Sequence, residues 1–195
     1  MVKLARELAG KAHEGEVRKI RQQPFISHPI GVARIASEYD PSDFTQSLSL
    51  LHDIVDQPLA RERLPLPEIR EQFGYEMVLA IGSLSKSLKA KTEEDAKLDY
   101  LLVSKMETDP QIQLVRAADK IHNLEQAIEE LHLVQHGFWR HFKGGKEAYL
   151  RWPADVLGAI RASRAIDGHE ILLRYETTIE RFYAAADDQP SDQAS

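Results

Sequence analysis

Four residues far apart in the sequence have the side chains of a metal site. His28, the adjacent pair His52 and Asp53, and Asp119 each lie in a stretch whose apolar pattern predicts a buried helix or a helix end. An uncompensated imidazole or carboxylate is costly in such surroundings. One divalent cation, bound by two imidazole nitrogens and two carboxylate oxygens from three helices, would compensate all four. Because a lone histidine on an apolar helix is more often a hydrogen-bonded core residue, the prediction depends on the four residues together.

The donor set indicates which metals and which chemistry to expect. The chain has no cysteine, so thiolate ligands are excluded and only His, Asp and Glu remain as strong ligands. Two nitrogens and two carboxylate oxygens suit Mn²⁺, Fe²⁺, Mg²⁺ or a catalytic zinc with open coordination positions. A cation with open positions acidifies bound water and neutralises phosphate oxygens. Hydrolysis of a phosphoester or a pyrophosphate is therefore the expected reaction.

Helices are predicted around each of the four residues, because apolar side chains recur there at helical spacing. Pro29 can occupy the first position of a helix capped by Ser27 or His28. The segment 44–56 forms the next such helix and carries the histidine–aspartate pair near its last buried turn. The helix 111–130 follows the capping signal Asp-Pro and carries the fourth ligand in its middle. The basic stretch before the first ligand is predicted to be a loop.

The remaining segments predict an all-α fold with about eight to ten helices, because no run alternates strongly enough to indicate a strand. The segment 58–67, with three prolines, is expected to be largely loop, and Pro153 is expected to open a helix. One domain is expected over residues 1–186, followed by a polar, disordered tail at 187–195. Further helices are expected at 2–14, 67–73, 76–88, 98–106 and 169–186.

Composition and charge exclude several classes of partner. The formal net charge of -6 and the pI near 5.8 argue against a broad surface for nucleic acid. No stretch has the length or the apolar character of a membrane span or a signal peptide. We expect a cytoplasmic protein that binds a small molecule, and the general frequency of two-fold oligomers favours a homodimer.

Four motifs occur in a fixed order: HEGEVRKIRQQPFISHPIGVA, LSLLHDIVD, a Phe-Gly pair followed by SLSK, and LVRAADKIHNLE. Together they resemble the hydrolase domain of the RelA/SpoT family and the small alarmone hydrolases, which belong to the HD-domain superfamily of metal-dependent phosphohydrolases. The resemblance covers roughly residues 4–165. It implies a single HD-domain helical bundle, Mn²⁺ bound by the four residues named above, and removal of the 3′-pyrophosphate from a guanosine alarmone such as ppGpp.

The same resemblance implies roles for residues around the metal. Arg18 and Lys19 match a basic loop that contacts the phosphates and the base, and Asn123 matches an asparagine beside the nucleotide. Where these hydrolases carry glutamate then aspartate after the HD pair, this chain has Asp56 and Gln57. Asp56 keeps the carboxylate that would position and deprotonate water, whereas Gln57 cannot accept a proton. Two alternatives therefore stay open: a phosphohydrolase of another nucleotide, or a nucleotide sensor that has lost turnover.

Further expectations concern the walls of the site. The residues after Asn123 that could line a nucleobase pocket are Glu125, Gln126 and Glu130. The two glutamates favour donor groups on a base without distinguishing adenine from guanine. Lys120, next to a buried ligand on a helix, is expected to point to solvent. The aromatic and basic segment 138–152 is expected to be a loop followed by a short helix.

Overall fold

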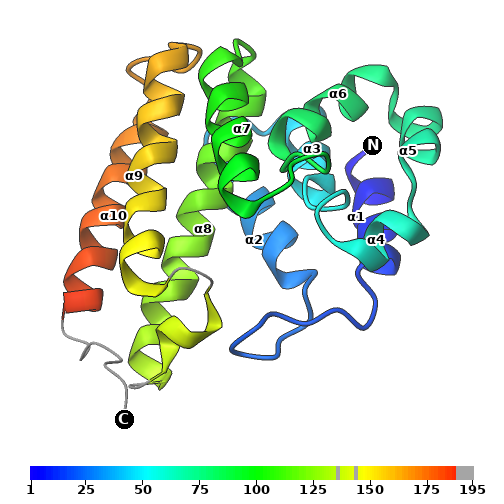
Figure 1. The fold of residues 1–195 in the computed structure, drawn as a ribbon. Coiled ribbons are helices and arrows are strands. Elements are labelled where there is room, and N and C mark those ends of the chain that lie inside the picture. Colours follow the sequence, from blue (N-terminus) through cyan, green and yellow to red (C-terminus); the bar gives the residue numbers. More distant parts are fainter. Residues whose placement is uncertain (135–136, 143–144, 188–195) are drawn as a thin grey trace.

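The structure is a computed structural model that describes residues 1–134, 137–142 and 145–187, and these residues form helices and loops without a strand (Figure 1). The all-α prediction is confirmed. The helices are α1 (Val2–Ala12), α2 (Ser27–Ser37), α3 (Asp43–Leu51), α4 (Pro58–Arg63), α5 (Leu66–Phe73), α6 (Tyr75–Leu84), α7 (Glu93–Met106), α8 (Pro110–Val134), the 3₁₀ helix η1 (Phe138–His141), α9 (Gly145–Ser163) and α10 (Glu170–Asp187).

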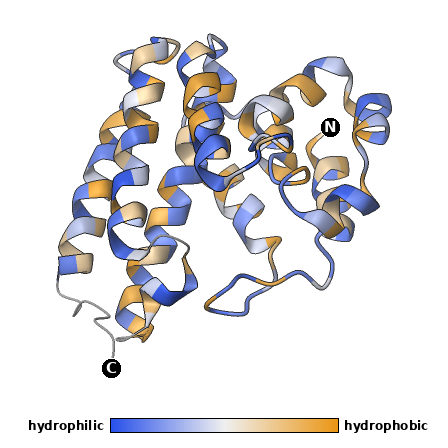
Figure 2. Cartoon of the chain, in the orientation of Figure 1, coloured by the Kyte–Doolittle hydropathy of each residue, from blue (hydrophilic) through white to orange (hydrophobic). Residues whose placement is uncertain are grey.

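The long helix α8 lies at the centre of the molecule. It packs against α10 and α2 most extensively, and also against α3, α6 and α9. In Figure 1, α1 and α3 to α6 form one side of the fold, α7 to α10 form the other, and α2 lies between them. Hydrophobic and hydrophilic residues alternate along the helices (Figure 2), and the buried apolar residues form one core. On α8 these include Val115, Ala118 and Ile121, each with no exposed surface.

Side-chain hydrogen bonds fix where α3 and α8 begin. Oδ1 of Asp109 accepts hydrogen bonds from the backbone N–H groups of Gln111 and Ile112, as the Asp-Pro signal predicted for α8. Asp40, in the loop before α3, accepts hydrogen bonds from Thr45 at 2.5 Å and from the side chain of Gln111 at 2.8 Å. Burial alone would raise the pKa of Asp40, but hydrogen bonds from Gln111, Thr45 and Ser42 lower it to about 2. This network fastens the start of α3 to the start of α8.

Two proline-based predictions were wrong. The segment 58–67 is not largely loop, because Pro58 begins the short helix α4 and Pro67 lies in the first turn of α5. Both prolines occupy positions whose N–H has no partner within the helix, so neither breaks one. Pro153 does not open a helix: it lies inside α9, which begins at Gly145. Tyr149, in the short segment expected before Pro153, packs on Phe182 of α10, and such tertiary contacts outweigh the local preference.

The apolar residues that indicated α7 are mostly not part of the core. Leu98, Leu102 and Met106 are more than half exposed, and the buried face instead carries Ala96, Tyr100 and Ser104. The helix also starts earlier than expected, at Glu93, because the side chain of Thr92 caps it. At the other end of the chain α10 extends through Asp187, and the rest of the expected tail, 188–195, lies outside the described residues. No helix in the described part of the chain is long and apolar enough to cross a membrane.

Candidate metal centre

The structure brings the four predicted ligands together between α2, α3 and α8. Nε2 of His28 lies 3.1 Å from Oδ1 of Asp119 and 3.3 Å from Oδ2 of Asp53. Nε2 of His52 lies 3.5 Å from Oδ1 of Asp53 and 3.8 Å from Oδ1 of Asp119. One ligand atom from each of His28, His52 and Asp119 falls within 4.8 Å of the other two. Asp53 is not part of this group of three, but its two carboxylate oxygens lie beside the Nε2 atoms of the two histidines.

Local structure explains how each ligand reaches this point. His28 lies in the first turn of α2, which begins at Ser27 without a side-chain cap, so the predicted capping by Ser27 or His28 is wrong. Instead the Ser27 hydroxyl donates a hydrogen bond to the backbone oxygen of Pro24. His52 is the C-cap of α3, which ends at Leu51 and not at Asp56 as the sequence predicted, and Asp53 follows in the turn before α4. His52 keeps helical backbone angles, so the two adjacent side chains diverge by about 100°, and their different lengths let both reach the same region.

The histidine rings are oriented by hydrogen bonds on their far nitrogens. Nδ1–H of His52 donates to the backbone oxygen of Ser49 at 2.8 Å, and Nε2 of the same ring is buried without a hydrogen-bond partner in the described structure. Nδ1 of His28 lies 2.9 Å from Nδ1 of His122. Burial, followed by the proximity of His28, lowers the pKa of His122 to about 3, so His122 is neutral and its Nδ1 can accept the Nδ1–H of His28 in one of its two tautomers. With Nδ1–H of each ring as the donor, both Nε2 atoms face the two carboxylates, where a cation would replace a proton as their partner.

His122 is a residue that the sequence interpretation missed. It lies three residues after Asp119 on α8, so the motif ADKIHN contains both the ligand and the residue that orients another ligand. Its ring occupies space beside Gly31 of α2, where an added Cβ would lie 2.0 Å from Nε2 of His122. Glycine is therefore required at this position for α2 to approach α8.

Gly31→Ala is expected to lower the free energy of unfolding by about 1–3 kcal/mol, because a methyl group forced against a buried ring displaces it. The displaced ring would also release His28, so metal affinity should fall about 10-fold or more. Thermal unfolding and metal titration measure the two effects. The matched control is Gly158→Ala in α9, where no described neighbour lies within 4 Å of the added Cβ and higher helix propensity should stabilise the protein slightly. Equal unfolding free energies and equal metal affinities of the two variants would contradict the role of His122 in orienting His28.

The charges at the centre favour a bound cation. Burial opposes protonation of His52, but Asp53 and then Asp119 outweigh it and raise the pKa of His52 to about 9. Burial likewise opposes ionisation of Asp119, yet Lys120 and the two histidines hold its pKa well below the usual value. Anionic oxygens facing a buried imidazole nitrogen are the surroundings that a divalent ion requires. The donor set and the geometry therefore fit a divalent metal.

Lys120 does not point to solvent, contrary to the prediction. Its Nζ lies 2.6 Å from Oδ2 of Asp119 and 4.9 Å from the centre of the Tyr100 ring, and its side chain is 16% exposed. The attraction of the buried carboxylate and the ring outweighs the hydration of the ammonium group. Lys120 thereby becomes a cation inside the site.

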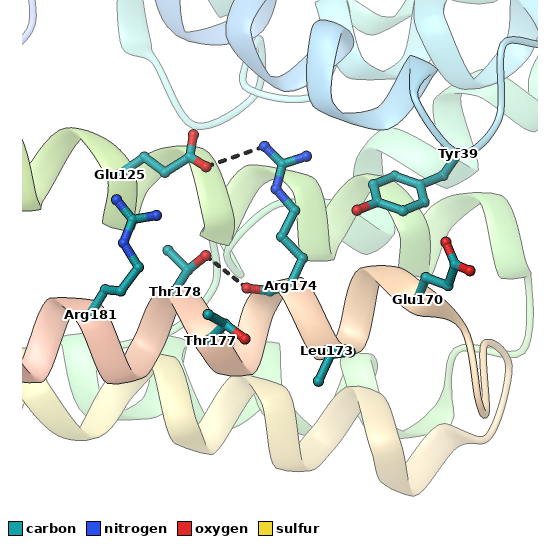
Figure 3. A pocket seen from close by; sticks show the side chains of 8 residues that line it. All are labelled: Tyr39, Glu125, Glu170, Leu173, Arg174, Thr177, Thr178 and Arg181. Carbon is teal, nitrogen blue, oxygen red and sulfur yellow. Dashed lines mark hydrogen bonds and ion pairs between the residues drawn. The ribbon is translucent and has the colours of Figure 1, made fainter.

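A cavity of about 870 Å³ opens from the metal centre and is large enough for a nucleotide. Its lining includes the candidate residues Arg18, Lys19, Asp56, Gln57, Asn123 and Glu130. Phe142, Tyr149 and Trp152 form an aromatic wall. Of the three residues considered for a nucleobase pocket, only Glu130 lines this cavity. Glu125 lines a separate, open groove of about 470 Å³ between α8 and α10, where it accepts a hydrogen bond from Arg174 (Figure 3).

The basic loop is fastened to the metal centre by a chain of hydrogen bonds. Nη2 of Arg18 donates to Oδ1 of Asn123 at 2.9 Å, and Nδ2 of Asn123 donates to Oδ1 of Asp119 at 2.6 Å. The guanidinium of Arg18 also lies 5.8 Å from the centre of the Phe25 ring. Lys19 lies 6.0 Å from the centre of the Phe142 ring, on the aromatic side of the cavity. The two cations thus face the same space as the predicted ligands.

Asp56 lines the cavity one turn beyond Asp53. Its carboxylate accepts hydrogen bonds from the backbone N–H of Lys86, at 3.1 and 3.4 Å, and so connects the HD motif to the SLSK motif. Burial, followed by repulsion from Asp53, raises the pKa of Asp56 to about 6. Gln57 precedes α4 and lines the same cavity without a capping hydrogen bond. A carboxyl group that titrates near neutrality beside a metal centre is suited to proton transfer.

Comparison with known proteins agrees with this fold. The model of the HD domain matches residues 5–142, and the chain therefore belongs to the HD-domain family. The predicted resemblance to RelA/SpoT proteins is confirmed: a guanosine-3′,5′-bis(diphosphate) 3′-pyrophosphohydrolase from Haemophilus influenzae is 30% identical over 122 residues, which are 60% of this chain and 17% of the relative. A GTP pyrophosphokinase from Streptomyces coelicolor is 30% identical over 125 residues, 63% of this chain and 14% of the relative.

Solved structures share the fold over most of the chain. A metazoan SpoT ortholog, described as hydrolysing ppGpp, superposes with a TM-score of 0.73 over 92% of this chain and 94% of its own, at 18% identity. A protein from Listeria monocytogenes EGD-e superposes with a TM-score of 0.67 over 80% of this chain and 99% of its own, at 19% identity. By contrast, the chain spans only 14–17% of the length of the two curated relatives described above.

Proposed function

We propose that this protein is a divalent-metal-dependent hydrolase that removes the 3′-pyrophosphate from (p)ppGpp or a related alarmone nucleotide. The observation that carries the proposal is the meeting of two imidazoles and two carboxylates at one end of a nucleotide-sized cavity. The HD-domain match supports a hydrolase, and the relatives that act on guanosine 3′-pyrophosphates support the substrate class.

In this proposal His28, His52, Asp53 and Asp119 hold the ion, and Mn²⁺ is the ion proposed. When bound, the ion would acidify a water molecule and neutralise phosphate oxygens. Asp56 is the group placed to accept the proton of the attacking water, since its pKa of about 6 leaves it mostly ionised at neutral pH.

Cationic side chains along the cavity are proposed to hold the phosphates. Lys120 lies at the metal centre, and Arg18 and Lys19 lie on the loop that faces it. Asn123 holds Arg18 in place through their hydrogen bond. Because cations near a polyanion raise both affinity and encounter rate, this arrangement suits a nucleotide with several phosphates.

Incubation of the Mn²⁺-loaded protein with ppGpp is expected to release pyrophosphate, measured by chromatography of the products. No turnover of any 3′-pyrophosphorylated nucleotide would overturn the proposal. A panel that adds a nucleoside monophosphate and a dinucleotide 2′-phosphate tests the alternative of a phosphohydrolase with another substrate. Strict preference for ppGpp would reject that alternative.

The nucleotide-sensor alternative follows from Gln57, which cannot accept a proton. If the natural chain binds ppGpp without turnover and Gln57→Asp creates hydrolysis, the sensor replaces the enzyme as the proposed function. Efficient turnover by the natural chain would dismiss the sensor. A cytoplasmic location and a homodimer stay predictions from the sequence.

A further inference from the structure

Arg116 is a buried cation that the proposed function does not use. It lies on α8 three residues before Asp119, it has no exposed surface, and the described lining of the large cavity does not include it. Its Nη1 donates a hydrogen bond to Oε1 of Gln113 at 2.6 Å, and its guanidinium lies 5.4 Å from the centre of the Tyr100 ring. Because burial of a cation is costly, the hydrogen bonds of Arg116 must compensate the lost hydration.

The other end of the guanidinium binds the C-terminal end of α6. Nη2 of Arg116 donates to the backbone oxygen of Ser83 at 2.6 Å and lies 3.2 Å from the hydroxyl oxygen of the same residue. Ser83 is the last residue but one of α6, so its carbonyl is among the four that have no partner inside the helix, and a cation there complements the helix dipole. The Ser83 hydroxyl donates in turn to Oε2 of Glu107 at 2.5 Å. Arg116 thus joins the end of α6 to α8.

The chain that leaves α6 leads directly to Asp56. The backbone N–H and the hydroxyl of Ser85 both donate to the backbone oxygen of Ile81, at 3.0 and 2.8 Å, and so fix the direction in which the chain leaves the helix. The next residue, Lys86, donates its backbone N–H to the two carboxylate oxygens of Asp56, at 3.1 and 3.4 Å. The donor to Asp56 therefore follows closely after the carbonyl that Arg116 holds.

Asp56 itself lies in the turn between α3 and α4, so a regular helix does not fix the direction of its carboxylate. We propose that Arg116 is a positioning residue, which holds the end of α6 where the N–H of Lys86 orients Asp56 toward the attacking water. The inference rests on the proposed function, in which Asp56 accepts the proton of that water. It gives a core residue an effect on the reaction without contact with metal or substrate.

Arg116→Met replaces the guanidinium by an apolar chain, and replacement of buried charged groups by apolar residues of similar size is often tolerated. We expect kcat for ppGpp to fall about 10- to 100-fold, because small displacements of reacting groups have effects of this size. KM and metal content should change little. Arg116→Lys keeps the charge and one donor for Ser83, so its kcat should exceed that of Arg116→Met. The matched control is Arg174→Met on α10, whose guanidinium pairs with Glu38 and Glu125 beside the separate groove. This control should match the natural protein.

The combination with Asp56→Asn tests whether Arg116 acts through Asp56. In that background Arg116→Met should lower kcat no further, because the carboxylate that Arg116 positions is already absent. A purely structural role would lower kcat by the same factor in both backgrounds. Equal factors would therefore overturn the inference, and so would loss of metal from Arg116→Met.

Hydrogen exchange at the Lys86 amide, followed by NMR, tests the inference without turnover. Exchange should be about 10-fold or more faster in Arg116→Met than in the natural protein, because a hydrogen bond to a charged acceptor is weakened. Unchanged exchange would overturn the inference. Absence of turnover in the natural protein would overturn the proposed function, and the exchange measurement would still decide whether Arg116 positions Asp56. Circular dichroism monitors the fold, and Arg116→Gln, which is shorter, replaces Arg116→Met if that variant does not fold.

Discussion

Replacement of His52 by glutamine is expected to abolish metal uptake and, with it, hydrolysis of the nucleotide. The Nε2 atom of His52 is buried, has no hydrogen-bond partner among the residues that the structure describes, and faces both carboxylates. An amide group cannot replace imidazole as a ligand. Loss of a residue that only orients a metal ligand through a hydrogen bond costs about 10- to 100-fold in metal affinity. Loss of the ligand itself should therefore cost more. Metal content after gel filtration and turnover of ppGpp measure the two effects.

His132→Gln is the matched control, because His132 lies exposed near the end of α8, away from the ligands. It should retain metal and activity. Stoichiometric metal in His52→Gln, with the thermal stability of the control, would refute the four-residue site. Unfolding of the variant is monitored by circular dichroism, so a loss of fold is distinguished from a loss of a ligand.

The replacement Asp56→Asn is expected to lower kcat by about 10²- to 10⁴-fold, the usual cost of removing a general base. The Asp56 carboxyl must be ionised to accept a proton, and burial with the Asp53 charge raises its pKa to about 6. Activity of the natural protein should therefore fall as the pH is lowered through about 6. The pH profile of kcat for the variant should lack this acidic limb.

Asp155→Asn, an exposed position on α9, serves as the control for the loss of a carboxylate. Metal content should be unchanged in both variants, which separates Asp56 from the ligands. A residual activity of Asp56→Asn close to that of the natural protein would show that another group accepts the proton. Retention of the acidic limb in the variant would lead to the same conclusion.

The fold was predictable from the sequence to the extent that its signals are local. The helical spacing of apolar residues in α8 and the capping signal Asp109–Pro110 each depend only on residues close together in the sequence, and the structure has both the helix and the cap. Pro153 shows the limit, because its effect depends on whether distant residues hold the surrounding helix. Packing of α9 against α7 and α10 supplies that support, and no local rule includes it.

The candidate site was predictable where the chemistry of metal binding restricts which residue types can be ligands. Because the chain has no cysteine, two histidines and two aspartates in apolar helices indicated a shared cation, and the structure brings them together. The direction of Lys120 was not predictable, because a lysine on a helix turns toward whichever carboxylate or ring lies near it. His122 was missed for the same reason, since its partners Gly31 and His28 lie on another helix.

The sequence alone was enough to predict three features of this protein. Periodicity gave the helical class, composition gave the types of metal-binding residue, and the order of the motifs gave the resemblance to a hydrolase family. Each of these signals is present in the order of residues and does not require the distances between helices. Only the tertiary structure shows which side chains contact one another and which line the cavity. Asn123 joins the basic loop to Asp119, Glu125 accepts a hydrogen bond from Arg174, and Glu130 lines the cavity. These arrangements could not be read from the sequence, since the packing of the whole core sets the distances between helices.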